Sequence, residues 1–116
     1  MARSAPRRLN VLQDLAGELD SAFFKALSEP ARVELLKFLI RSGASDIETI
    51  AAKFPQDRSV ISRHIAALRD VGLVRCEKEG RHMVCSVDGQ AFVEKLESIL
   101  GVVRAAIAQC CPPKSK

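Results

Sequence analysis

The sequence predicts a mainly α-helical domain with one small β-hairpin, in the order α-α-α-α-β-β-α. Three observations carry this prediction. Apolar residues recur at helical spacing in four segments before position 71 and in one segment after position 88. Capping residues, prolines and glycines separate these segments. Between them, residues 73–87 hold two β-prone runs on either side of a Glu-Gly turn.

The length of 116 residues fits one domain, and 47% hydrophobic residues can build its core. We expect a disordered basic arm at 1–8, a folded domain at 9–111 and a tail at 112–116. The apolar stretches are too short to cross a bilayer. The arginines near the start have no apolar signal-peptide region behind them. We therefore expect a cytoplasmic protein without a membrane partner.

The first two helices are predicted from their apolar stripes and their ends. The first spans Leu9–Leu27. Ser28 then offers an N-cap, and Pro30 occupies the first turn of the next helix, where its missing N–H costs little. This second helix spans Glu29–Arg41 and stops at Gly43.

Two further helices follow at short spacing. Ser45 and Glu48 form a capping box at the start of a short third helix, Asp46–Lys53. Pro55 ends this helix, because the residue before a proline is pushed away from helical geometry. The fourth helix is expected at Arg58–Asp70.

The C-terminal third of the domain predicts a hairpin and a long helix. The strand candidates are Leu73–Glu77 and Arg81–Val87. Asp88 caps the last helix, Gln90–Gln109.

A short helix, a tight turn and a longer helix between residues 46 and 70 predict a helix-turn-helix, and the hairpin makes it a winged helix-turn-helix. In that motif the second helix lies in the DNA major groove with its N-terminal residues facing the base edges. Arginine can bind guanine bidentately, and hydroxyl and imidazole groups can donate to bases or phosphates. The candidate DNA-binding residues are those of the turn and of the first helical turns: Gln56, Arg58, Ser59, Ser62, Arg63 and His64.

The hairpin adds three basic candidates where a wing would reach the DNA backbone, namely Lys78, Arg81 and His82. The net charge of +4 suits a polyanionic partner such as double-stranded DNA. The alternative for the helix is a solvated polar face on a core element. The basic wing beside it favours DNA binding.

Several motifs in order resemble one family. Residues 26–36, ALSEPARVELL, resemble the signature helix of the ArsR/SmtB repressors, and residues 59–74, SVISRHIAALRDVGLV, resemble their recognition helix and its exit. Glu79-Gly80-Arg81 resembles their wing turn. The resemblance covers roughly residues 24–87. It implies a homodimeric bacterial repressor that an inducer, usually a metal ion, a metalloid or a thiol-reactive species, releases from DNA.

The resemblance also implies that the first and last helices form the dimer interface. The stripe on the last helix fits that role, since its steps of four and three residues are the seam spacing of paired helices. The alternative is packing on the chain's own core, although one small core cannot easily cover the stripes of both helices. The expected dimer residues are Leu12, Leu15, Leu19, Phe92, Leu96, Ile99 and Val103.

The inducer site departs from the best-known members. The helix before the recognition helix has no cysteine for a thiolate site, and the last helix has no Asp or His for a zinc site. The adjacent Cys110 and Cys111 remain, as in certain arsenic-responsive members. Two thiolates suit As(III), Cd(II) or Zn(II), and no third cysteine follows them. The alternative is that Cys110, which continues the apolar stripe, is a small buried hydrophobe.

Cys76 and Cys85 are second candidates for a thiophilic ion. They lie on opposite strands of the hairpin, and a two- or four-residue loop puts both on one face. Three roles stay open for them: a cross-strand disulfide, a site for a thiophilic ion, or half-buried filler.

The leading functional hypothesis is a DNA-binding repressor released by a thiol-binding inducer, with As(III) species first and no catalytic cofactor. One alternative is a redox- or sulfide-responsive repressor switched by disulfide formation. Another is a winged-helix protein-interaction module that does not bind DNA. We expect no enzyme, because the sequence has no Ser/His/Asp grouping, paired-carboxylate site or phosphate-cradling glycine loop.

Overall fold

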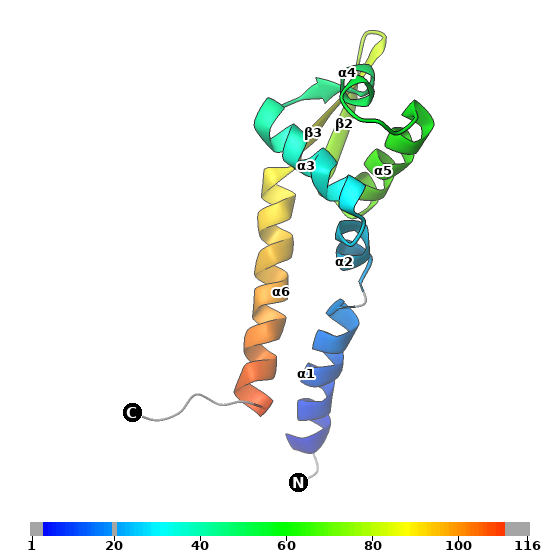
Figure 1. Ribbon diagram of the computed structural model, residues 1–116. Coiled ribbons are helices and arrows are strands. Elements are labelled where there is room, and N and C mark those ends of the chain that lie inside the picture. The colour runs from blue at the N-terminus through cyan, green and yellow to red at the C-terminus, as the bar shows by residue number, and fades with distance from the viewer. Residues whose placement is uncertain (1–3, 20, 111–116) are drawn as a thin grey trace.

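The computed structural model describes the backbone of residues 4–19 and 21–110 and the side chains of residues 10–19 and 21–109. Two long helices, α1 (Ser4–Leu19) and α6 (Gly89–Cys110), run side by side and extend from a compact part that holds the other elements (Figure 1). The principal extents are 62 × 27 × 24 Å. The hairpin projects at the end of the molecule opposite the two chain termini (Figure 1).

The compact part contains four helices and a three-stranded antiparallel sheet of order β1-β3-β2. The bounds are α2 Ala22–Leu27, α3 Pro30–Ser42, β1 Ser45–Asp46, α4 Ile47–Ala52, α5 Arg58–Asp70, β2 Val74–Glu79 and β3 His82–Val87. The predicted fold class is confirmed, because a helix-turn-helix (α4 and α5) is followed by a β-hairpin wing and a long helix.

The predicted first helix, Leu9–Leu27, is wrong as one element. The structure divides it into α1 and α2, and α1 begins at Ser4 within the predicted disordered arm. The Ser21 hydroxyl accepts a hydrogen bond from the backbone N–H of Phe24 at 3.5 Å. A serine that caps a new helix in this way offers the backbone an alternative to continuing the old one.

Two predicted caps are also wrong, each by one residue. Ser28 ends α2 and donates its hydroxyl to the carbonyl of Lys25, while Glu29 is the N-cap residue of α3. Asp46, not Ser45, caps α4 by accepting from the N–H of Thr49 at 2.8 Å. Ser45 instead lies in β1 opposite Cys85 and donates to the carbonyl of Gly43. The extended backbone that β1 requires moves the helix start one residue on.

The core joins the helix-turn-helix to the base of the wing. Its members include Leu35, Leu39, Ile61, Leu68 and Cys85, each at most 2% exposed. β3 contacts α3 and α4, and β2 contacts α5, so one core holds α5 and the wing at a defined angle. Among the described residues, no helix is both long and apolar enough to cross a membrane.

Candidate nucleic-acid interface

Helix α5 presents one apolar and one polar face. Ile61, Ile65 and Leu68 are buried, which fixes the rotation of the helix on the core. The opposite side exposes Ser59 and Arg63, one turn apart. The bounds Arg58–Asp70 agree with the prediction. An element held by its buried face and carrying arginine and hydroxyl groups on the other can enter a major groove.

The wing is a tight hairpin. Glu79 pairs with His82, so the loop is the two residues Gly80 and Arg81, and Gly80 has the positive φ of 63° that such turns need. Lys78 and Arg81 are exposed near the tip, and no ion pair involves either within the described part of the chain. Both cations are therefore available to a phosphate backbone.

His82 ties the wing to the helix-turn-helix. Its Nδ1 lies 2.8 Å from Oδ2 of Asp46, the residue that caps α4. The backbone N–H of Thr49 holds the pKa of Asp46 below its ordinary value, and the nearby His82 acts in the same direction. The carboxylate of Asp46 thus joins the start of α4 to the start of β3.

Two more contacts involve candidate DNA-binding residues. Nε of Arg58, at the start of α5, lies 2.6 Å from Oε2 of Glu48 on α4. Nε of Arg32 on α3 donates to Nδ1 of His64 at 3.2 Å. Arg32, Asp46 and Glu48 are not among the residues predicted from sequence to bind DNA. Arg32 and His64 both lie in the motifs that resemble the family. Their contact was not predicted because the two residues are 32 positions apart in the sequence.

Gln56 differs from the other predicted DNA-binding residues. Its side-chain oxygen Oε1 is buried, and no described residue forms a hydrogen bond with it. It borders a hollow of about 490 Å³ between the α4–α5 turn and the start of α3, with Phe54, Pro55 and Glu34 nearby. The structure therefore turns at least the oxygen end of Gln56 inward, away from the face that carries Ser59 and Arg63.

The predicted dimer residues fall into two groups. Phe92 and Ile99 pack against the chain's own core. Leu19 and Leu96 are exposed, at 62% and 49%, and Leu12, Leu15 and Val103 are half-buried. The exposed apolar residues Val93, Leu96, Leu100 and Ile107 form a stripe on α6 with the half-buried Val103, in steps of three and four residues. This stripe shares only Leu96 and Val103 with the predicted dimer residues of the last helix.

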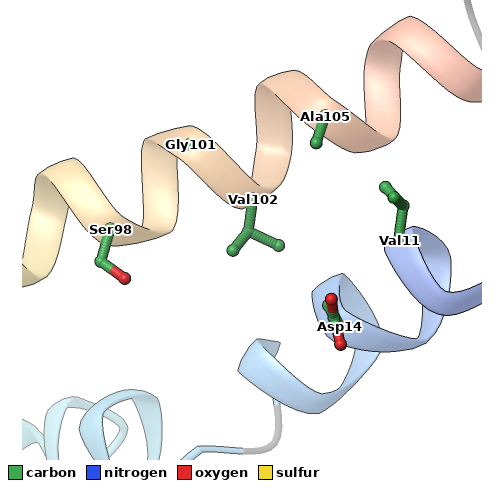
Figure 2. Close-up of a pocket in the computed structure, with 6 residues that line it drawn as sticks. All are labelled: Val11, Asp14, Ser98, Gly101, Val102 and Ala105. Carbon is green, nitrogen blue, oxygen red and sulfur yellow. The ribbon is translucent and has the colours of Figure 1, made fainter.

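Between α1 and α6 lies a shallow hollow of about 260 Å³, lined by Val11 and Asp14 of α1 and by Ser98, Gly101, Val102 and Ala105 of α6 (Figure 2). The small side chains on α6 leave this space because they cannot fill the gap between the helices. Nearer the compact part, Nζ of Lys95 lies 3.4 Å from the Glu18 carboxylate and over the ring of Phe23. The helices are thus joined at one end and leave apolar surface at the other.

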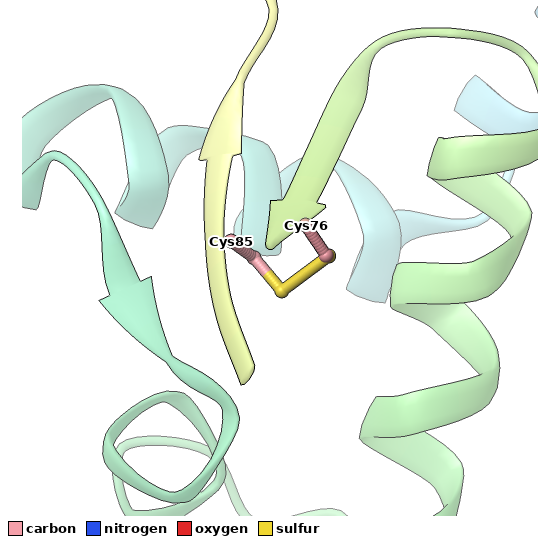
Figure 3. Close-up of a disulfide and its surroundings, with 2 residues drawn as sticks. All are labelled: Cys76 and Cys85. Atoms are coloured by element: carbon pink, nitrogen blue, oxygen red, sulfur yellow. A yellow bond between two sulfur atoms is a disulfide. The ribbon is translucent and has the colours of Figure 1, made fainter. Parts of the chain in front are cut away.

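Two of the four cysteines form a disulfide. Cys76 and Cys85 are direct partners in the β2–β3 ladder and their sulfurs are bonded (Figure 3). The structure thus has the disulfide, not the half-buried filler or the ion site. The side chain of Cys110 and all of Cys111 lie outside the described residues, so their proposed role stays a prediction. Within the described residues, no group of three or more His, Cys, Asp and Glu could hold a metal ion.

The family model HVO_A0114 matches residues 27–91. A probable mercury resistance operon repressor of Streptomyces lividans is 32% identical over 92 residues, which are 77% of this chain and 72% of that protein. An ArsR-like transcriptional regulator from Rhodococcus sp. RHA1 has 28% identity and a TM-score of 0.66, over 85% of this chain and 97% of that one. The chain belongs to the ArsR family. It is a winged helix-turn-helix DNA-binding transcriptional regulator and not an enzyme.

Other similar proteins align with this chain over most of their length. An uncharacterised helix-turn-helix-type regulator of Mycobacterium tuberculosis strain H37Rv is 28% identical over 79% of this chain and 77% of that protein. A solved structure described as a possible transcriptional regulator for arsenical resistance is 28% identical, with a TM-score of 0.59, over 78% of this chain and 95% of that one. This ArsR-family chain therefore shares more than three quarters of its length with each of these relatives.

Proposed function

We propose that this ArsR-family regulator is a homodimeric repressor that inserts α5 into the major groove of its operator and places the wing on the adjacent backbone. One observation carries the proposal: Ser59 and Arg63 are exposed on α5 while its opposite face is buried in the core. Lys78 and Arg81, exposed near the wing tip, supply phosphate contacts at a fixed offset from α5.

The carboxylates of α4 act as internal partners for the DNA-binding cations. Glu48 holds Arg58 at the start of α5, and Asp46 holds His82 at the start of β3. The Arg58–Glu48 pair is exposed on both sides, where such contacts contribute little to stability, whereas the Asp46 side chain is only 19% exposed. Arg58 can therefore exchange Glu48 for a phosphate at small cost, whereas Asp46 keeps the wing close to the helix-turn-helix.

A second copy of the chain covers the apolar stripe on α6. Val93, Leu96, Leu100 and Ile107 are 45–49% exposed in the single chain, and exposed apolar residues in a continuous seam mark an association surface. A dimer built on this seam presents two α5 helices to two half-sites.

The inducer is a thiol-binding species, with As(III) first and Cys110 and Cys111 as its ligands. Soft thiolates select such ions, and the Streptomyces relative bears the name of a mercury resistance operon repressor. A redox-responsive repressor is the second candidate, and the disulfide between Cys76 and Cys85 favours it.

DNA binding is tested by fluorescence anisotropy on DNA from upstream of the protein's own gene. We expect affinity to fall steeply as salt rises, because binding releases counterions from phosphates. Arg63→Ala should weaken binding about tenfold or more, while Arg104→Ala on exposed α6 should leave it unchanged. Equal binding by Arg63→Ala would contradict base contact through this face of α5, and no salt-dependent binding at all would favour the protein-interaction module.

The inducer is tested by adding arsenite to the preformed complex with DNA. Release from wild-type protein, and its loss in Cys110→Ser/Cys111→Ser, is the expected result. Normal release from that double variant would exclude these cysteines as the As(III) site. Release by an oxidant or reductant and not by arsenite would favour the redox candidate.

A further inference from the structure

We infer that the Cys76–Cys85 pair is a reversible thiol–disulfide switch, and that its oxidised form is the state with the higher affinity for DNA. This inference rests on the proposed DNA-binding function and names a regulatory site for it. The site lies at the base of the wing, and the segment between the two cysteines contains Lys78, Arg81 and His82 (Figure 3).

The backbone accommodates the bond. The two residues are directly opposite in the ladder, with Cα atoms 4.1 Å apart. That is the spacing of the close, non-hydrogen-bonded pairs of an antiparallel sheet. The register that opposes Cys76 to Cys85 is set by the tight turn at Gly80 and by the flanking pairs, such as Val74 with Val87. The pair can therefore open and close without a change of register.

The two sulfurs differ in access. Cys85 lies on the central strand β3 and is 0% exposed, whereas Cys76 lies on the edge strand β2 and is half-buried. An external thiolate therefore attacks the Cys76 sulfur. Cys85 must then leave as a thiolate inside an apolar core, which is unfavourable. The disulfide consequently resists bulky monothiols and yields to a small dithiol.

Dithiothreitol reduces the disulfide in two steps. A thiolate of dithiothreitol bonds to the Cys76 sulfur, the Cys76–Cys85 bond breaks, and Cys85 takes up a proton. The second thiolate of dithiothreitol then displaces Cys76, so that the reagent is oxidised to a cyclic disulfide and two protein thiols form. Re-oxidation runs in reverse with a low-molecular-weight disulfide as oxidant, which is reduced to two thiols.

Reduction should loosen one strand of the wing more than the other. β3 stays between β1 and β2 and is also held through the contact of His82 with Asp46. β2 has a single neighbouring strand, so once the bond is cut its only link to the rest of the sheet is the hydrogen-bonded ladder with β3. The residue whose position then becomes less defined is Lys78, one of the expected phosphate contacts.

The test uses the full-length variant Cys110→Ser/Cys111→Ser, in which only the wing pair can respond. The protein is prepared with oxidised glutathione or with dithiothreitol, and alkylation with mass spectrometry counts its thiols. We expect two thiols to be gained on reduction, faster hydrogen exchange in β2 with α5 unchanged, and DNA affinity weaker by about fivefold, the size of one lost phosphate contact. Reduction by glutathione should be slower than by dithiothreitol.

Two matched variants connect the switch to its output. In Lys78→Ala, the oxidised and reduced forms should bind DNA with about equal affinity. Reduction should still speed hydrogen exchange in β2. Cys76→Ala/Cys85→Ala should bind DNA like the reduced protein and ignore both reagents. Equal affinity in the two redox states, or thiols that never oxidise, would overturn the inference. If neither redox state binds DNA, the proposed DNA-binding function fails. In that case, hydrogen exchange in β2 that does not change on reduction would separately refute the switch.

Discussion

The two ends of this molecule use apolar residues in opposite ways. At the DNA-binding end, α3, α4, α5 and the base of the wing bury Leu35, Ile61 and Leu68 completely. At the other end, α1 and α6 leave Leu96 and Leu100 about half-exposed. The first end is a finished core within one chain. The second is an unfinished one, which the proposed partner chain completes.

This contrast explains how a small domain divides its tasks. The angle between α5 and the wing depends only on contacts within the chain, so one chain carries a complete pair of proposed DNA-binding elements. In the proposed dimer, the distance between the two α5 helices depends on the α6 seam. A change at one end should therefore alter folding or base contacts, and a change at the other should alter pairing.

The largest expected effect comes from a cavity at the DNA-binding end. Leu68→Ala removes a side chain that is 0% exposed beneath α5. It should lower the free energy of unfolding by about 2–5 kcal/mol, as measured by urea denaturation. Ala66→Ser, on the exposed face of the same helix, should cost less than about 1 kcal/mol. Equal losses for the two variants would contradict the assignment of α5's faces.

The next largest effect is expected from a charge placed on the exposed apolar seam of α6. Leu96→Glu places a carboxylate among the exposed apolar residues of α6 and should produce a monomer in analytical ultracentrifugation. Its affinity for a two-half-site DNA should fall by about a hundredfold, because the second contact becomes a separate binding event. Glu97→Gln, at the adjacent exposed position, is the control. A dimeric Leu96→Glu would place the partner chain elsewhere.

A smaller effect tests the internal partner of Arg58. Glu48→Gln removes the carboxylate beside this arginine and one negative charge near the DNA surface. We expect DNA affinity to rise about threefold, within the range of exposed ion pairs. Glu34→Gln, whose partner is Lys37 on α3, serves as the control in the same anisotropy assay. Weaker binding by Glu48→Gln would show that the pair orients Arg58 for DNA.

The smallest expected effect is a change in how thermal stability depends on acid pH. Asp46 has a lowered pKa in the folded chain, so its stabilising contribution is present above the ordinary pKa of an aspartate. That contribution is lost as the pH falls through the lower, folded value. Asp46→Asn keeps a capping oxygen but cannot titrate, so its Tm should depend less on pH below about 4. Asp46→Ala also removes the cap and should lower Tm by a few degrees at neutral pH. An unchanged acid dependence in Asp46→Asn would contradict this role.

Some features of both ends of the molecule could be predicted from the sequence, and others could not. The bounds of α5 and the two β-prone runs were predictable, because local periodicity and turn residues act over a few positions. The break at Ser21 and the cap at Asp46 were not, since both choices depend on competition between neighbouring polar residues. The cap lies at Asp46 because Ser45 pairs with Cys85 across the sheet.

The exposed basic residues of the candidate site were predictable from the sequence. The residues that contact other members of the site were not. Arg63, Lys78 and Arg81 stand out as basic residues on a helix and a hairpin. The contacts of Arg32 with His64 and of Asp46 with His82 join segments far apart in sequence. Similarly, an apolar stripe on α6 was evident, but only packing separates Phe92 and Ile99, which face the chain's own core, from the exposed seam.

The most direct test of the proposed repressor is a hydroxyl-radical and methylation-interference footprint on DNA from upstream of its own gene. Two copies of α5 and the wing should protect two patches on one face of the duplex, about 10 base pairs or a multiple of that apart. Interference at guanines in each patch should disappear with Arg63→Ala. A single protected patch, or two patches unaffected by Arg63→Ala, would contradict the account of a dimer that reads DNA through α5.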